Sequence, residues 1–247
     1  MKPFTTMLKT ELKLSLRGMD MVIFAICLPI VVLIILGNLY GSKAAFDGAS
    51  YTFLEQSFGA LTSIAICAGG VMGLPLVVSD YRGKQILKRF QVTPVSPTVI
   101  LLVQVTIYAL YALISLITLF LVATICFGFR MQGSILLFLF GWFLVMLSLF
   151  SIGIMVGGLA KNPKVAGIIA SVLYFPMLIF SGATLPYEAM PSAMQKLVEV
   201  LPLTQGIKIL KAAVLDLSIG NILVPICVLS IITFICSGIA IKFFKWE

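Results

Sequence analysis

The side chains that could do acid–base or metal chemistry are few in this sequence and are not gathered in one place. The chain has no histidine, which removes the commonest general base and the commonest transition-metal ligand. Its five cysteines all lie inside apolar segments without a C-x-x-C pair or a metal-ligand spacing, as is typical of cysteines buried as small apolar residues. We therefore predict no catalytic residue and no metal site.

The sequence also lacks the groups that would power transport within one chain. Nucleotide hydrolysis needs a phosphate-binding loop of the form G-x-x-x-x-G-K-[ST], but Gly83-Lys84 is followed by Gln85 and has Val78 in place of the first glycine. Ion-coupled carriers usually keep ionisable groups at mid-membrane, whereas the nine acidic residues fall in expected loops or at the ends of expected spans. Polar side chains within spans, such as Gln104, are isolated, so a passive or partner-driven conduit remains.

The composition predicts an all-α integral membrane fold. Hydrophobic residues make up 61% and charged residues 11% of the chain, and the mean hydropathy is +1.16. A spanning helix needs about 20 mostly apolar residues. Six segments approach or exceed that length, and we expect them to form one transmembrane domain over residues 1–247; they are 21–40, 58–78, 99–127, 134–159, 165–180 and 219–241. The fifth is the shortest and therefore the least secure.

The distribution of basic residues predicts how the chain is oriented. With six spans both chain ends lie on one side, and most of the 17 Lys and Arg residues fall in the connections on that side. The positive-inside rule makes this side cytoplasmic in the cell membrane. The net charge of +8 is explained by this orientation, so we expect no nucleic acid as a partner.

Residues 1–20 predict an amphipathic helix at the membrane surface. At about 100° per residue, one broad arc is apolar and comprises Phe4, Met7, Leu8, Leu12, Leu14, Leu16 and Met19. The opposite arc is basic and comprises Lys2, Lys9, Lys13 and Arg17. Such a helix is expected to lie along the cytoplasmic headgroups of the lipid. A helix packed on other protein is the alternative.

A cytoplasmic loop at 79–97 carries a second amphipathic pattern. Ile86, Leu87 and Phe90 stand at helical spacing, and the prolines at its end stop the helix. An inert basic loop that obeys the positive-inside rule is the alternative. The three apolar side chains favour a helix that binds a groove on a partner, because exposed apolar patches mark interaction surfaces.

The segment 181–216, between the fifth and sixth spans, is expected to be external and interrupted. The residues that break it include Gly182, Pro186, Pro191 and Pro202. Irregular backbone at membrane depth is tolerated only where protein or water covers it, so we predict one or two short re-entrant or interfacial helices. Gly69-x-x-x-Gly73 and Gly153-x-x-x-Gly157 predict close helix packing.

Two motifs resemble those of type-2 ABC exporter permeases. The first is Leu87-Lys88-Arg89-Phe90-x-x-Thr93-Pro94-Val95-Ser96, which resembles the first cytoplasmic loop of that family. The second runs from Ser181-Gly182-Ala183-Thr184-Leu185-Pro186 through Met190-Pro191 to Leu201-Pro202-Leu203-Thr204 and resembles the landmarks before its last helix. The chain departs from the family where many members have an acidic cluster and Gly-Thr before the basic pair.

The resemblance implies the role of each motif and the partners. Ile86, Leu87 and Phe90 would be the buried anchor of a coupling helix on a separate ATP-binding subunit, with Lys88 and Arg89 at its rim. Two permease subunits, identical or different, would assemble with two ATPase subunits that hold ATP and Mg²⁺, and this chain would bind no cofactor. The expected function is outward movement of a hydrophobic or amphipathic compound such as a drug, antibiotic or peptide. A polysaccharide or lipid-linked glycan exporter is the alternative within the family, and an ion-coupled carrier or a membrane enzyme is the alternative outside it.

Overall fold

The computed structural model describes residues 2–19, 21–40, 43–45, 49–85, 97–181, 191, 195–196, 198–217 and 222–243. The regular structure of these residues is helical, apart from one isolated β-bridge between Ala44 and Thr52. In chain order the helices, with π-helical turns labelled η, are α1 (Lys2–Gly18), η1 (Val22–Cys27), α2 (Leu28–Tyr40), α3 (Phe53–Cys67), η2 (Ala68–Gly73), α4 (Leu74–Gly83), α6 (Pro97–Phe127), α7 (Ile135–Leu159), α8 (Pro163–Phe180), α10 (Pro202–Leu215) and α11 (Leu223–Phe243).

Six helical stretches of the described chain are long and apolar enough to cross a membrane, which confirms the predicted all-α membrane fold. They are Val22–Tyr40, Phe53–Gly83, Thr98–Phe127, Ile135–Leu159, Pro163–Phe180 and Leu223–Phe243. The second extends beyond the predicted 58–78 because a capping box begins it early: Glu55 N–H donates to Thr52 Oγ1 at 3.2 Å, and Thr52 N–H donates to Glu55 Oε2 at 2.7 Å. The last begins later than the predicted 219.

Both π-helical turns end two residues before a proline. Pro29 and Pro75 each occupy the second position of the α-helix that follows η1 and η2. Proline lacks an N–H, and its ring crowds the carbonyl four residues earlier. The wider turn accommodates this ring, and such turns are frequent at functional sites. The first two spans therefore continue through their prolines as single long helices.

The second span lies at the centre of the bundle. Its apolar window is 83% buried, against 56% for the span of α7 and 17% for that of α8. Gly153 and Gly157 of α7 let that helix approach closely, because a Cβ on Gly157 would lie 2.7 Å from the Cβ of Val78, and one on Gly153 would meet the carbonyl of Gly70. The Gly153-x-x-x-Gly157 spacing is therefore a packing face against the central helix, whereas Gly73 faces Tyr108 of α6 and Met21.

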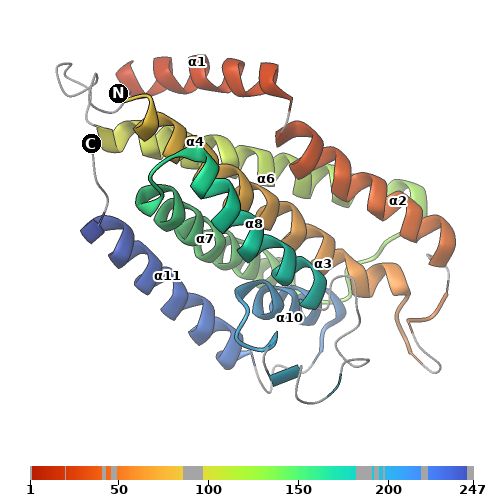
Figure 1. The fold of residues 1–247 in the computed structure, drawn as a ribbon. Helices are drawn as coiled ribbons and strands as arrows, with labels where there is room; N and C mark the ends of the chain where they lie inside the picture. The colour runs from red at the N-terminus through yellow and green to blue at the C-terminus, as the bar shows by residue number, and fades with distance from the viewer. Residues whose placement is uncertain are drawn as a thin grey trace.

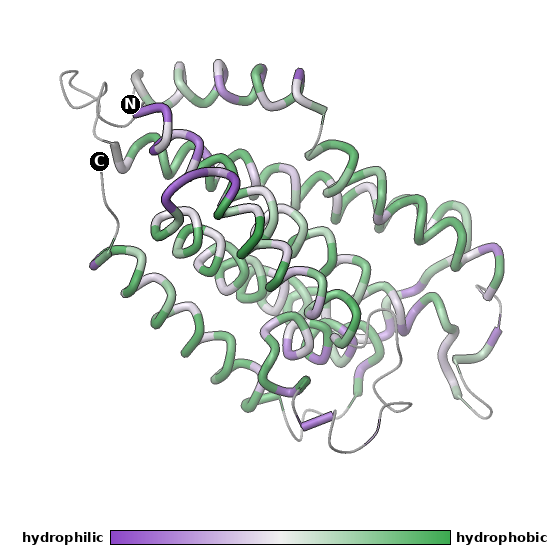
Figure 2. Tube along the Cα trace, viewed as in Figure 1, coloured by the Kyte–Doolittle hydropathy of each residue, from purple (hydrophilic) through white to green (hydrophobic). Residues whose placement is uncertain are grey.

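The ends of the bundle differ in character. Figure 1 shows both labelled chain termini at the same end of the bundle, with α1 beside that end and α10 at the other. Figure 2 shows apolar residues along the spans and polar residues gathered towards their ends. This arrangement agrees with an even number of crossings. The cytoplasmic location of the end with the termini stays a prediction from the charge distribution.

The packed face of α1 is narrower than the apolar arc that the sequence predicted. Phe4, Met7, Leu8 and Leu12 pack against a cluster formed by η1 and α6. The other three apolar residues of the predicted arc are exposed: Leu14 is 60%, Leu16 49% and Met19 52% exposed. Their exposure within the chain does not contradict a helix that lies along the headgroups, so that position stays a prediction; Met19 lies beyond the end of α1 at Gly18. Lys9, Lys13 and Arg17 are exposed, as expected.

Candidate functional site

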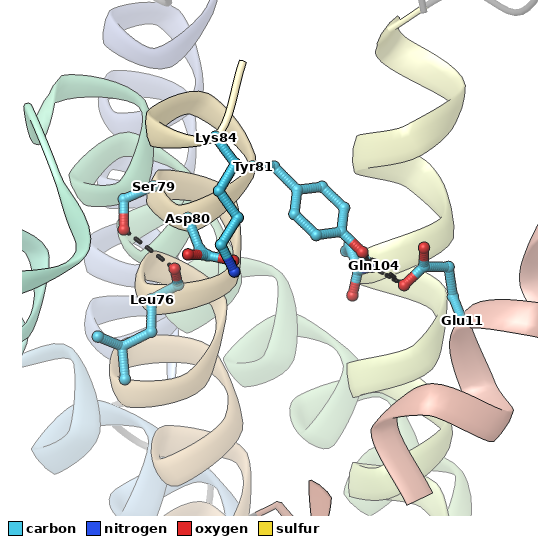
Figure 3. Close-up of polar contacts among 7 residues, drawn as sticks. All are labelled: Glu11, Leu76, Ser79, Asp80, Tyr81, Lys84 and Gln104. Atoms are coloured by element: carbon cyan, nitrogen blue, oxygen red, sulfur yellow. Dashed lines mark hydrogen bonds and ion pairs between the residues drawn. The ribbon is translucent and has the colours of Figure 1, made fainter. Parts of the chain in front are cut away.

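Polar side chains from three helices meet at the end of α4. Tyr81 Oη donates to Glu11 Oε2 of α1 at 2.5 Å, and Gln104 Nε2 of α6 donates to the same carboxylate oxygen at 3.1 Å and to Tyr81 Oη at 2.9 Å. Figure 3 shows the tyrosine ring reaching from α4 to the other two side chains. We call Glu11, Tyr81 and Gln104 the polar junction. It connects α1, α4 and α6 at one point.

Glu11 is positioned for this contact by the helical spacing of α1. It lies between the apolar residues of the face that packs on α6, and Ser15, one turn later, accepts a hydrogen bond from Tyr111 Oη at 2.9 Å. The donors to Glu11 are a hydroxyl and an amide. Hydrogen bonds to a carboxylate are stronger than those between neutral groups, so the junction fixes α1 in register with α6.

Arg82, the next residue after Tyr81, connects α4 to a fourth helix. Its Nη1 donates to the carbonyl oxygen of Ala160 at 2.9 Å and to that of Gly158. The last carbonyl groups of a helix have no partner within the helix, and here the guanidinium supplies one for α7. By contrast, the neighbouring Asp80–Lys84 ion pair of 2.8 Å is exposed and contributes at most about 1 kcal/mol.

The polar junction adjoins the segment that the sequence singled out. The predicted coupling residues Ile86, Leu87, Lys88, Arg89, Phe90, Thr93 and Pro94 lie outside the described residues. The described chain stops at Gln85 and resumes at Pro97. Tyr81 and Arg82 therefore hold the helix that leads into this segment, and Gln104 belongs to the helix that follows it.

The predicted landmarks between the fifth and sixth spans are only partly described. Ser181 is 2% exposed at the end of α8, Pro191 is exposed, and Pro202 is buried at the start of α10. Gly182 and Pro186 lie outside the described residues. The same holds for the side chain of Lys2, which belongs to the predicted basic face of α1. The 14-residue helix α10 packs against α3 and α7. It is too short to span a bilayer, and its location outside the cell stays a prediction.

An apolar groove runs beside the central helix. It has a volume of about 560 Å³ and lies between η1 and α2 on one side, α8 on the other, and the α3–η2–α4 helix at its base. None of the described residues that line it is charged; they are Met21, Phe24, Leu28, Pro29, Val32, Leu61, Ile64, Ala68, Met72, Leu76, Tyr174, Phe175 and Leu178. The groove can hold an apolar molecule.

Among the described residues, no group of three or more His, Cys, Asp or Glu side chains could hold a metal ion. The absence of a metal site in the whole chain stays a prediction.

Sequence reasoning missed the polar junction and Arg82. Glu11 and Tyr81 are 70 positions apart, and Glu11 and Gln104 are 93 apart, so no local pattern joins them. One signal was present: Glu11 lies within the apolar arc of α1, where a carboxylate needs a partner.

Comparison with known proteins gives consistent matches. Residues 2–215 match the family model described as "ABC-2 type transporter". A stretch of 85 residues is 31% identical to the inner membrane transport permease YhhJ of Escherichia coli K12, and the protein of the same name from Shigella flexneri matches equally. That stretch covers 34% of this chain and 23% of each relative.

Proposed function

The chain belongs to the ABC-2 type transporter family, and on that premise we propose that it is the membrane-spanning permease subunit of an ATP-driven ABC exporter. Energy comes from two separate ATPase subunits that bind ATP and Mg²⁺, and the conduit is completed by a second permease subunit. The protein lies in the cell membrane with both termini in the cytoplasm. The observation that carries the proposal is the set of contacts that Tyr81 and Arg82 make immediately before the segment 86–96.

Those contacts give a physical route from the ATPase to the transmembrane helices. In our proposal the segment 86–96 docks on the ATPase subunit, with Leu87 and Phe90 buried in its groove. A displacement of that segment pulls on the end of α4. Tyr81 transmits the displacement to α1 and α6, and Arg82 transmits it to the end of α7. Because the close packing at Gly153 and Gly157 restricts sliding between α7 and the central helix, the two helices move together.

The groove supports a hydrophobic or amphipathic substrate, such as a drug, an antibiotic or a peptide. The central helix forms its base, so the displacement described above changes its shape. A volume of about 560 Å³ and a mostly apolar lining are typical of sites that bind small apolar ligands. A polysaccharide or lipid-linked glycan is the second candidate substrate. The observation that favours it is the presence of Phe24, Tyr174 and Phe175 in the lining, because sugars stack on aromatic rings.

The docking step is tested by the double variant Leu87→Asp and Phe90→Asp, assembled with the cognate ATPase subunit in lipid nanodiscs. We expect two buried charges at the docking face to abolish assembly or the stimulation of ATP hydrolysis by the permease, while membrane insertion persists. Val200→Asp, at an exposed position at the other end of the bundle, is the matched control and should retain stimulation. Full stimulation in the double variant would refute the docking role of the segment.

A further inference from the structure

Two smaller cavities lie next to the polar junction and the apolar groove and share lining residues with one another and with the groove. The cavity at the junction has a volume of about 400 Å³ and is lined by residues that include Glu11, Asp80 and Tyr81. A second cavity of about 230 Å³ shares Leu76, Val77 and Tyr108 with it. This second cavity shares Met21 and Leu76 with the apolar groove. The three spaces therefore follow one another along the same side of the central helix.

The cavity at the junction is acidic. Two of its lining side chains are carboxylates, and none of the described residues that line it is basic. Lys84 forms an ion pair with Asp80, but Glu11 receives hydrogen bonds from the neutral groups of Tyr81 and Gln104 and forms no ion pair with any described Lys or Arg. The basic residues of α1 lie on its exposed face, away from this contact. Among the described residues, the Glu11 carboxyl group therefore has no cationic partner.

Met21 lines both the second cavity and the apolar groove, so it lies between these two spaces. Its side chain occupies the space beside Gly73, where an added Cβ would lie 2.7 Å from the Met21 sulfur. Methionine is unbranched and flexible, so it can turn aside without rearrangement of the backbone. A Cβ at Gly73 would also meet the ring of Tyr108, so the glycine lets the Met21 and Tyr108 side chains lie close to the central helix. Met21 is therefore a movable divider between the second cavity and the groove.

We propose that these cavities form an access route for amphiphilic cations. The positive head of the molecule binds at Glu11, where Coulomb attraction in a partly buried site is stronger than in water and the rings of Tyr81 and Tyr108 add cation–π attraction. The apolar body moves past Met21 into the groove, where none of the described lining residues is charged. This inference rests on the proposed export function and narrows its substrate class to lipophilic compounds that carry a positive charge.

Binding of two probes of the same shape and opposite charge tests the charge selectivity. The purified chain in nanodiscs, without any ATPase subunit, is equilibrated with tetraphenylphosphonium or tetraphenylborate, and binding to empty nanodiscs is subtracted. We expect the cation to bind and Glu11→Gln to weaken its affinity roughly tenfold, with no loss for the anion. Tyr81→Phe keeps the carboxylate and the aromatic ring, so it should weaken cation binding less than Glu11→Gln does, even though it raises the population of detached α1. Glu199→Gln, at the other end of the bundle, is the matched control.

Equal affinity for the two probes, or equal loss of cation binding in Glu11→Gln and Tyr81→Phe, would overturn the role of the Glu11 charge. The route past Met21 is tested by Met21→Ala, which should speed association of the cation; an unchanged rate would refute that route. Failure of the charge test or of the Met21 test would not contradict the permease assignment, because no ATPase subunit takes part in either. Conversely, a chain that never assembles with an ATPase subunit would overturn the permease assignment without contradicting the cation site.

Discussion

Removal of the hydroxyl group of Tyr81 should release α1 from the bundle. Tyr81→Phe keeps the ring but removes the hydrogen bond of 2.5 Å to Glu11 and the one of 2.9 Å from Gln104. A hydrogen bond to a charged group contributes about 1.5–3 kcal/mol and one between neutral groups about 1 kcal/mol. Water replaces part of both at this half-buried site, so we expect a net loss of about 2 kcal/mol, or a roughly thirtyfold higher population of detached α1.

Hydrogen–deuterium exchange of the α1 amides in nanodiscs measures this population. The variant should exchange roughly thirtyfold faster over residues 5–15, in proportion to the population of the open form. Tyr40→Phe is the matched control, because the Tyr40 ring contacts Phe53 at the other end of the bundle and its hydroxyl takes part in no hydrogen bond to a described residue. Equal exchange of α1 in the two variants would refute the anchoring role of the polar junction.

Two further substitutions test the contacts around the junction. Arg82→Leu removes the donors to the last carbonyl groups of α7, each of which contributes about 1.5–3 kcal/mol, and should speed amide exchange in the last turn of α7. Lys84→Leu loses only an exposed ion pair and should leave the exchange of that turn unchanged. The same exchange in both variants would contradict the capping role of Arg82. Gly153→Ala places a methyl group against the Gly70 carbonyl and should lower the midpoint of thermal unfolding through an overpacking cost of about 1–3 kcal/mol. Gly238→Ala adds a methyl group in open space and should not lower it. An unchanged midpoint for Gly153→Ala would show that α7 and the central helix are not in close contact.

The six spans were predictable because each is a run of apolar residues that only lipid can solvate. Their ends were less predictable. The start of the second span depends on the reciprocal bonds of Thr52 and Glu55, which extend the helix beyond its apolar run. The π-helical turns had a visible cause in Pro29 and Pro75, but periodicity alone does not distinguish a π-turn from an α-turn.

The candidate site was predictable only in its location. The apolar residues at 86–90 and the resemblance they carry pointed to the segment that follows the second span, and that segment stays a prediction because it lies outside the described residues. The polar junction required the tertiary structure, since Glu11, Tyr81 and Gln104 come from three helices. The helical wheel of α1 did not show which part of its apolar arc packs on α6, because that depends on the tertiary structure.

The central claim is that a separate ATPase drives transport through this chain. The most direct test is transport into inside-out vesicles that contain the chain with or without its cognate ATPase subunit, with tetraphenylphosphonium and the neutral dye Nile red as probes. Our account predicts that uptake of at least one probe requires both ATP and the ATPase subunit and continues when proton and sodium gradients are collapsed. Uptake that persists without the ATPase subunit and stops when an ion gradient is collapsed would contradict it.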